Sequence, residues 1–309
     1  MSFPIGRWLG VAALAFTAYA AALFFLQEGM LGQAGALLLS RTGLFAALLC
    51  LTSYMLRGLR WRAWMALQDR PLALGQALRY YLAGYAFTPT PGNLGEAVRG
   101  MLLAHQPLPL GKSIALFGAE RLADLLCLLL LALPAAWWLL PAVSSGWRTA
   151  LTVVLGLCLI TAVLAVRRVG ASERLRPMVM QRLPWLHAAW ICLAHRPAQW
   201  FSLTLAAWAM QGLAVWLLCD LALVTASPLQ ASASYALAMV GGALSMLPAG
   251  LGGTEALLLA QLLAQGADFG AAVLLTVLAR LLTLWFAVAL GLACLFYSVL
   301  LCKDMRLGT

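Results

Sequence analysis

The chain has 309 residues, of which 64% are hydrophobic and 10% are charged, with a formal net charge of +10 at pH 7. Soluble domains are about 45–50% apolar and about 25% charged, so the composition excludes a soluble domain and indicates an all-α, polytopic integral membrane protein. The basic excess suits anionic lipid headgroups, whereas nucleic acid is excluded as a partner because no soluble domain carries the scattered arginines.

Apolar runs of about 20 residues, the length needed to cross a bilayer, predict the spanning helices. We expect spans near residues 8–27, 43–61, 115–140, 147–166, 197–224 and 269–302. The first run is interpreted as a retained span rather than a cleaved signal.

Clusters of basic residues orient these spans, because cytoplasmic loops carry an excess of lysine and arginine. Three clusters are assigned to the cytoplasm: Arg57, Arg60, Arg62 and Arg70; Arg167, Arg168, Arg174, Arg176 and Arg182; Lys303 and Arg306. Both termini are then expected in the cytoplasm.

Two further apolar segments, 72–110 and 228–266, are interrupted by glycine and proline. The orientation of the neighbouring spans requires each segment to end on the side of the membrane where it began. Each segment therefore forms a re-entrant hairpin or crosses twice, and we favour two re-entrant hairpins built from broken helices, one from each face.

The two hairpins resemble each other in sequence. The first contains PGNLGE at 91–96 and the second contains PAGLGGTE at 248–255. Glu96 precedes Arg121 by 25 residues, and Glu255 precedes Arg280 by 25 residues. With opposite orientations of the two halves, this pattern predicts an inverted-topology repeat of the kind found in secondary transporters. Two unrelated helix breaks are the alternative.

The expected organisation is a single transmembrane domain, 1–309. Its parts are an N-terminal span (1–42), repeat one (43–140), a connecting span and cytoplasmic loop (141–196), inverted repeat two (197–302) and a cytoplasmic tail (303–309).

The broken motifs free backbone groups at membrane depth, which is tolerated where protein or a polar cavity satisfies them. The residues expected to shape the hairpins are Pro91, Gly92, Asn93, Gly95, Pro248, Gly250, Gly252 and Gly253. A helix that restarts after such a break presents N–H groups and a partial positive charge to a phosphate. Glu96 is spaced to cap its helix in a capping box with Asn93, which does not exclude a role in a site with Arg99, and Thr254 could cap the second helix in the same way.

The cluster Glu120-Arg121-x-x-Asp124 places two carboxylates and an arginine on one helix. Such charges are costly inside a membrane unless they are paired. The cluster is either a structural ion pair or a site where one carboxylate takes and releases a proton. Arg280 has no carboxylate nearby on its own helix, so its partner is Glu255, Asp220 or a ligand phosphate. Tyr81 and Tyr85 are either interface anchors or headgroup contacts.

Neither a metal site nor a cofactor is expected. The seven cysteines lie singly, without a C-x-x-C pair, and the three histidines do not have the spacing of metal ligands.

Three motifs in order, T-P-x-P-G-N-L-G-E-A-x-R, E-R-L-x-D and P-A-G-L-G-G-T-E, resemble the lysylphosphatidylglycerol synthase transmembrane-region family, also called the flippase-like domain family. The resemblance covers nearly the whole chain and implies a lipid-handling membrane protein. Larger members carry a soluble aminoacyl transferase domain, so we expect a stand-alone member without synthetase activity.

The resulting hypothesis is a non-enzymatic transporter that moves an anionic envelope lipid, such as a phospholipid or a polyprenyl-phosphate-linked sugar, between leaflets of a bacterial inner membrane. Envelope-lipid biosynthetic enzymes are possible partners. A membrane-embedded lipid-modifying transferase and a non-transporting partner of an envelope-lipid synthase are the alternatives. The residues expected to contact substrate are Tyr81, Tyr85, Glu96, Arg99, Glu120, Arg121, Asp124, Thr254, Glu255 and Arg280.

Overall fold

The structure is a computed structural model that describes residues 30–103, 107–135 and 186–307, with isolated positions between 10 and 17 and between 138 and 161. The regular structure of these ranges is helical throughout, in agreement with the predicted fold class. In the first half the elements are α2 (Met30–Leu38), α3 (Arg41–Ala66), α4 (Leu74–Gly84), η1 (Tyr85–Phe87), η2 (Pro91–Gly100), α5 (Leu110–Ala132) and η3 (Leu133–Ala135). In the second half they are α9 (Leu186–Ala194), α10 (Pro197–Leu221), α11 (Pro228–Leu244), η4 (Pro248–Gly250), α12 (Gly253–Ala264), α13 (Phe269–Arg280), the π-helical turn η5 (Leu281–Trp285) and α14 (Phe286–Leu307).

Three helices of the described ranges are long and apolar enough to cross a membrane: Arg41–Ala66, Pro197–Leu221 and Phe269–Ser298. They coincide with three of the predicted spans. Helix α5 is 23 residues long and occupies the described part of the span predicted at 115–140. The spans predicted at 8–27 and 147–166, and the loop that follows to residue 185, lie outside the described residues.

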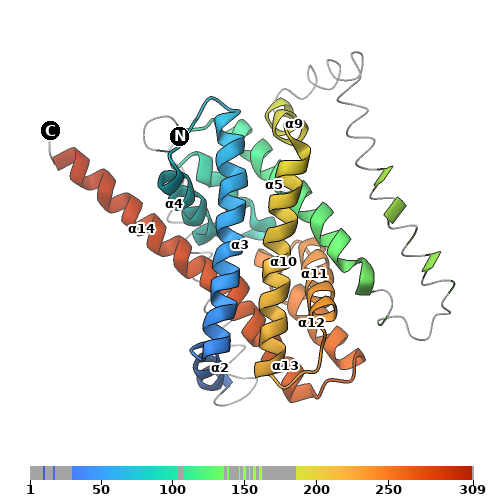
Figure 1. The fold of residues 1–309 in the computed structure, drawn as a ribbon. Coiled ribbons are helices and arrows are strands. Elements are labelled where there is room, and N and C mark those ends of the chain that lie inside the picture. Colours follow the sequence, from blue (N-terminus) through green and yellow to red (C-terminus); the bar gives the residue numbers. More distant parts are fainter. Residues whose placement is uncertain are drawn as a thin grey trace.

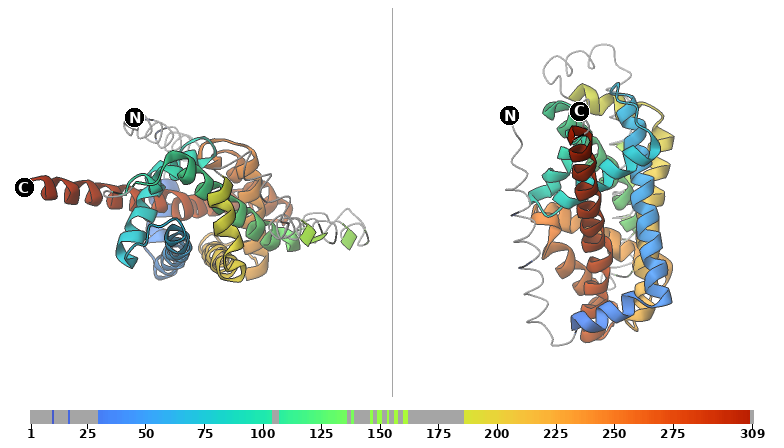
Figure 2. Two further views of the ribbon diagram at one scale, coloured as in Figure 1. Left: turned by 90° about the horizontal axis from the view of Figure 1, so that it is seen from above. Right: turned by 90° about the vertical axis from the view of Figure 1, so that its left-hand side faces the viewer.

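Helices α3 and α10 lie side by side and run in opposite directions along the long axis of the bundle (Figure 1). The start of α3 is fixed by Ser40, whose hydroxyl oxygen accepts a hydrogen bond from the Gly43 N–H at 3.2 Å. Helix α5 packs against α10 and α11, and its carboxylates Glu120 and Asp124 are buried in protein. Helix α14 extends beyond the other helices on one side of the molecule (Figure 2).

Both glycine- and proline-interrupted segments are broken helices. In the first, α4 has 11 residues and is followed by the short helices η1 and η2. At 1.5 Å per residue, α4 is about 16 Å long, which is about half the thickness of the hydrocarbon core. In the second, α11 and α12 flank η4. The two breaks meet, because η2 packs against η4.

The backbone of α14 touches the backbone of α4 and η1, just before the first break. A Cβ atom on Gly291 would lie 2.4 Å from the Ala86 nitrogen and 2.8 Å from the Leu82 oxygen, so only glycine permits this approach. The π-helical turn η5 precedes α14, and the Tyr54 hydroxyl lies 3.1 Å from the carbonyl oxygens of both Leu282 and Thr283 in that turn.

The assignment of Arg57 and Arg60 to a cytoplasmic loop is wrong. Helix α3 continues to Ala66, so both arginines lie within it, with exposed fractions of 5% and 0%. Of that predicted cluster, Arg62 is exposed and Arg70 is half-buried. The prediction failed because all four arginines were treated as residues that follow the span, although the predicted span 43–61 already includes Arg57 and Arg60 and no proline interrupts the helix before Pro71.

Candidate functional site

Each break consists of a proline followed by two residues in the left-handed region of backbone space. After Pro91, Gly92 has φ 58° and Asn93 has φ 56°. After Pro248, Ala249 has φ 54° and Gly250 has φ 65°. Both turns thus have the same backbone form, although the second places an alanine where the first has a glycine.

The remaining hairpin glycines lie close to neighbouring groups or carry unusual dihedrals. A Cβ atom on Gly95 would lie 2.6 Å from the Phe87 carbonyl oxygen. Gly252 has φ 84°, and a Cβ on Gly253 would lie 2.9 Å from the Ser245 hydroxyl oxygen. The tight turn before Gly95 is held by Thr90, whose hydroxyl donates to the Phe87 carbonyl at 2.9 Å and accepts from the Gly95 N–H at 2.8 Å.

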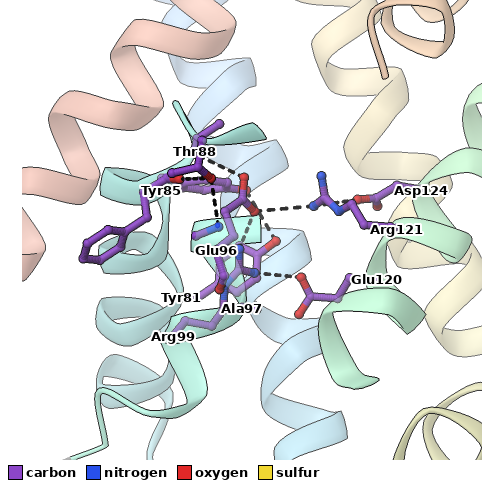
Figure 3. Close-up of polar contacts among 12 residues, drawn as sticks. Tyr81, Tyr85, Thr88, Glu96, Ala97, Arg99, Glu120, Arg121 and Asp124 are labelled. Carbon is purple, nitrogen blue, oxygen red and sulfur yellow. Dashed lines mark hydrogen bonds and ion pairs between the residues drawn. The ribbon is translucent and has the colours of Figure 1, made fainter. Parts of the chain in front are cut away.

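Six buried or half-buried charges form an unbroken chain of alternating sign across three elements, and most of it appears in Figure 3. We call this the six-charge chain; its members, in order of contact, are Arg60 (α3), Asp124 (α5), Arg121 (α5), Glu96 (η2), Arg99 (η2) and Glu120 (α5). The closest N–O distances are 2.9 Å for Arg60–Asp124, 3.1 Å for Asp124–Arg121, 3.5 Å for Arg121–Glu96 and 2.8 Å for Arg99–Glu120. Glu96 and Arg99 are also paired.

Glu96 is therefore part of the charge network. Its Oε1 accepts a hydrogen bond from the Thr88 hydroxyl at 2.9 Å, and its Oε2 contacts Arg99 and Arg121. Asn93 is in the left-handed conformation and its side chain does not cap η2, so the capping-box interpretation of Glu96 is wrong. The Arg121–Asp124 pair expected from their i,i+3 spacing is present.

Arg60 was missed as a site residue. Its Nη1 donates to Asp124 Oδ1 at 2.9 Å and to the Thr204 hydroxyl of α10 at 2.8 Å. Its Nε and Nη2 have no hydrogen-bond partner among the described residues. Two arginines three residues apart, Arg57 and Arg60, on a helix with no break until Pro71, were the signal in the sequence.

Arg57 was missed for the same reason, and it differs from Arg60 in having no ion-pair partner among the described carboxylates. Its Nη2 donates to Gln211 Oε1 at 3.2 Å, and its guanidinium lies 3.9 Å from the centre of the Trp208 ring. Its Nε has no hydrogen-bond partner in the described part of the chain.

The second break carries one ion pair. Arg280 Nε lies 2.7 Å from Glu255 Oε1, and Arg280 Nη2 donates to the Ala249 carbonyl at 2.8 Å. Glu255 Oε2 also accepts from the Gly252 N–H at 2.8 Å, so Glu255 rather than Thr254 caps α12. Thr254 is 1% exposed. Of the expected partners of Arg280, the structure places Glu255 against it, whereas Asp220 is exposed.

Tyr81 and Tyr85 are buried against Arg99 and do not lie at the surface as interface anchors would. The Arg99 guanidinium carbon is 4.3 Å from the Tyr81 ring centre, and the two tyrosine rings pack edge to face at 5.4 Å. A small enclosed space of about 10 Å³, just large enough for one water molecule, lies beside Glu96, Arg99 and Glu120.

The arrangement suits the binding of an anion. An alternating chain can exchange one carboxylate for a ligand phosphate while every arginine keeps a negatively charged neighbour. Among the described residues, no group of three or more His, Cys, Asp or Glu side chains is arranged to hold a metal ion.

A family model described as the lysylphosphatidylglycerol synthase TM region matches residues 7–291. This match confirms the resemblance seen in the three sequence motifs, and it spans both breaks, the six-charge chain and the Glu255–Arg280 pair. A comparison with curated proteins gave no match.

Proposed function

Because the chain belongs to the lysylphosphatidylglycerol synthase TM region family, we propose that it is a membrane transporter that moves an anionic, phosphate-bearing lipid between the leaflets of a bacterial inner membrane. A phospholipid and a polyprenyl-phosphate-linked sugar are the substrates to test first.

The observation that carries this proposal is an imbalance of charge inside the bundle. The six-charge chain is neutral, and so is the Glu255–Arg280 pair. Among the described residues, Arg57 is left over as a buried positive charge without an ion-pair partner, 5% exposed. A buried charge without a counter-ion is costly, so the interior favours binding one negative charge from outside the chain. A lipid phosphate supplies that charge.

The two breaks support a transport mechanism. They share the sequence of a proline and two left-handed residues, each contributes a glutamate that pairs with an arginine 25 residues later, and η2 packs against η4. We infer that they are re-entrant hairpins of an inverted-topology repeat. In such proteins, the site lies where two broken helices meet, and rocking of the halves exposes it to each side in turn.

The test is lipid sidedness in proteoliposomes. Vesicles with trace fluorescent anionic lipid or fluorescent phosphatidylcholine would be exposed to an impermeant quencher, with and without the protein. We expect protein-dependent movement of the anionic lipid, reduced by Glu96→Gln and Arg121→Gln. Arg41→Gln is the matched control, since Arg41 is exposed at the start of α3, away from the charges.

Two results would reject this function. If folded protein moves no lipid class, the chain is not a transporter of these lipids. If mass spectrometry finds a covalently altered lipid after incubation, the chain is a lipid-modifying transferase. Size-exclusion profiles of each variant would separate loss of fold from loss of movement.

A further inference from the structure

A groove runs between the last turns of α3 and the first turns of α10, on the opposite end of α3 from Arg41. It encloses about 400 Å³. We call it the α3–α10 groove; the residues that line it are Leu59, Arg62, Ala63, Ala66, Pro71, Leu72, Gln199 and Leu203. Its walls are therefore mostly apolar, which suits hydrocarbon more than a hydrated ion.

A narrow extension of about 20 Å³ joins the groove to the buried side chain of Arg60. The two share Ala63, Gln199 and Leu203, and the extension adds the side chains of Arg60, His195 and Arg196. Arg62 and Arg196 are exposed. None of the residues lining either part is acidic. The groove thus combines apolar walls with positive charge at its mouth and at its inner end.

The inner end holds donors that the described chain does not use. Arg60 is 0% exposed, and its Nη1 donates hydrogen bonds to Asp124 and Thr204. Its Nε and Nη2 have no hydrogen-bond partner among the described residues. Unsatisfied donors on a buried guanidinium are costly, so a ligand oxygen that reached them would be held firmly. Arg60 is also the first member of the six-charge chain.

We propose that the α3–α10 groove is the docking site of one anionic phospholipid from the surrounding bilayer. The headgroup phosphate contacts Arg62 and Arg196 and is then presented to Arg60, and the first methylenes of the acyl chains lie against Leu59, Ala63 and Leu203. The substrate class rests on the proposed function. The groove is then the place where the lipid first contacts the six-charge chain. There the Arg60 guanidinium exchanges its contact with Asp124 for a contact with the lipid phosphate.

The test is photocrosslinking from within the groove. A photoreactive amino acid at position 63, which lines both parts, would be activated in full-length protein in vesicles of phosphatidylcholine with or without phosphatidylglycerol. Lipid adducts are then measured by mass spectrometry. We expect the phosphatidylglycerol adduct to exceed the phosphatidylcholine adduct after correction for abundance. Each arginine near a membrane surface contributes roughly fivefold to the binding of anionic lipid, so Arg62→Gln with Arg196→Asn would lower the phosphatidylglycerol adduct by more than about tenfold.

These substitutions are chosen to preserve the fold. Both arginines are exposed, glutamine at 62 retains a donor for the Leu72 carbonyl, which Arg62 Nε contacts at 2.8 Å, and asparagine tolerates the left-handed conformation of residue 196. Arg41→Gln, at the other end of α3, would leave the adduct unchanged.

Equal adducts of the two lipids, or an undiminished adduct in the double variant, would overturn the proposal. The adduct would also be measured with excess inorganic phosphate and with chloride of equal ionic strength. If phosphate abolishes the lipid adduct and chloride does not, the groove is a site for free phosphate, and its assignment to a lipid is overturned. The two hypotheses, docking in the groove and transport, can be rejected independently. An arginine-dependent adduct without lipid movement would reject transport alone. Lipid movement without such an adduct would reject the docking site alone.

Discussion

The Glu255 carboxylate meets the Arg280 guanidinium at 2.7 Å across 25 residues of chain, and Glu96 meets Arg121 at 3.5 Å across the same separation. In both halves, the ion pair ties the helix that begins at the break to the helix that follows it. The halves differ in what surrounds the pair. Arg121 shares two carboxylates with its neighbours, whereas Arg280 has one carboxylate and the Ala249 carbonyl.

The Glu255–Arg280 pair is expected to couple energetically. Removing one partner of a buried ion pair costs roughly 3–5 kcal/mol, and we expect the lower end of this range for Glu255→Gln because the Glu255 side chain is 18% exposed. Replacing both partners, as in Glu255→Gln with Arg280→Met, would cost less than the sum of the single changes. Unfolding in detergent, analysed as a double-mutant cycle, measures this difference. Additive effects would show that the pair does not stabilise the break.

Asp124 is expected to be the most sensitive carboxylate. Asp124→Asn leaves the buried Arg60 without a carboxylate and the half-buried Arg121 with Glu96 alone, so we expect a loss of stability of about 3–5 kcal/mol. Asp220→Asn is the matched control, because Asp220 is exposed at the end of α10 and its substitution is expected to change stability by less than about 0.5 kcal/mol. Similar melting temperatures for the two variants would contradict the importance of the six-charge chain.

Gly95 tests the close packing of the first break. The Cβ of Gly95→Ala would overlap the Phe87 carbonyl oxygen at 2.6 Å, and such overpacking costs about 1–3 kcal/mol. The same substitution at Gly118 of α5 meets no atom within 4 Å and should stabilise the helix by up to about 1 kcal/mol. Thermal unfolding of the two variants should therefore shift in opposite directions, and a shared direction would show that the break adapts to the extra atom.

Ala249 tests the backbone of the second break. Its φ of 54° is unfavourable for a residue with a Cβ, by roughly 1–2 kcal/mol, so Ala249→Gly should relieve strain and offset the entropy that glycine adds to the unfolded chain. Ala256→Gly, on an exposed position of α12, should lose about 1 kcal/mol. The measurement is the difference in unfolding free energy between the two. A loss at Ala249 as large as at Ala256 would mean that the left-handed turn is not maintained.

Arg57 tests the origin of anion selectivity. A hydrogen bond to a charged group contributes about 1.5–3 kcal/mol, so Arg57→Gln should slow movement of the anionic lipid by roughly tenfold or more. Stability should fall much less than for Asp124→Asn, because no described carboxylate pairs with Arg57. Quencher accessibility in proteoliposomes measures the rate of lipid movement, and unfolding in detergent measures the stability. Full transport of anionic lipid by the variant would remove Arg57 from the mechanism.

Three of the long apolar helices and the positions of both breaks could be predicted from the sequence, because hydropathy and proline act locally. The pairing of Arg280 with Glu255 was one of three alternatives, and only tertiary packing decides among them. The roles of Glu96 and Asn93 were harder to predict. A capping box is a local pattern, but Glu96 instead pairs with Arg99 on its own short helix and with Arg121, which folding brings from α5.

Arg57 and Arg60 show the limit of the positive-inside rule. The rule treats an arginine near the end of an apolar run as a loop residue, and it does not consider that a carboxylate elsewhere in the chain can draw the arginine inside. Asp124 lies 64 residues away from Arg60 in sequence. No periodicity within α3 encodes that partner, although the absence of a helix-breaking residue before Pro71 shows that the helix could continue.

The approach of Gly291 to Ala86 has a mechanical consequence. Where two backbones touch without side chains between them, no rotamer can absorb a relative displacement, so we expect α14 to move together with α4 and η1, which lead into the first break. We expect bending at η5, whose π-helical turn joins α14 to α13 and to Arg280. Tilting α14 against the bilayer would therefore displace Thr88 and Glu96, which connects the last long helix of the chain to a buried carboxylate of its first half.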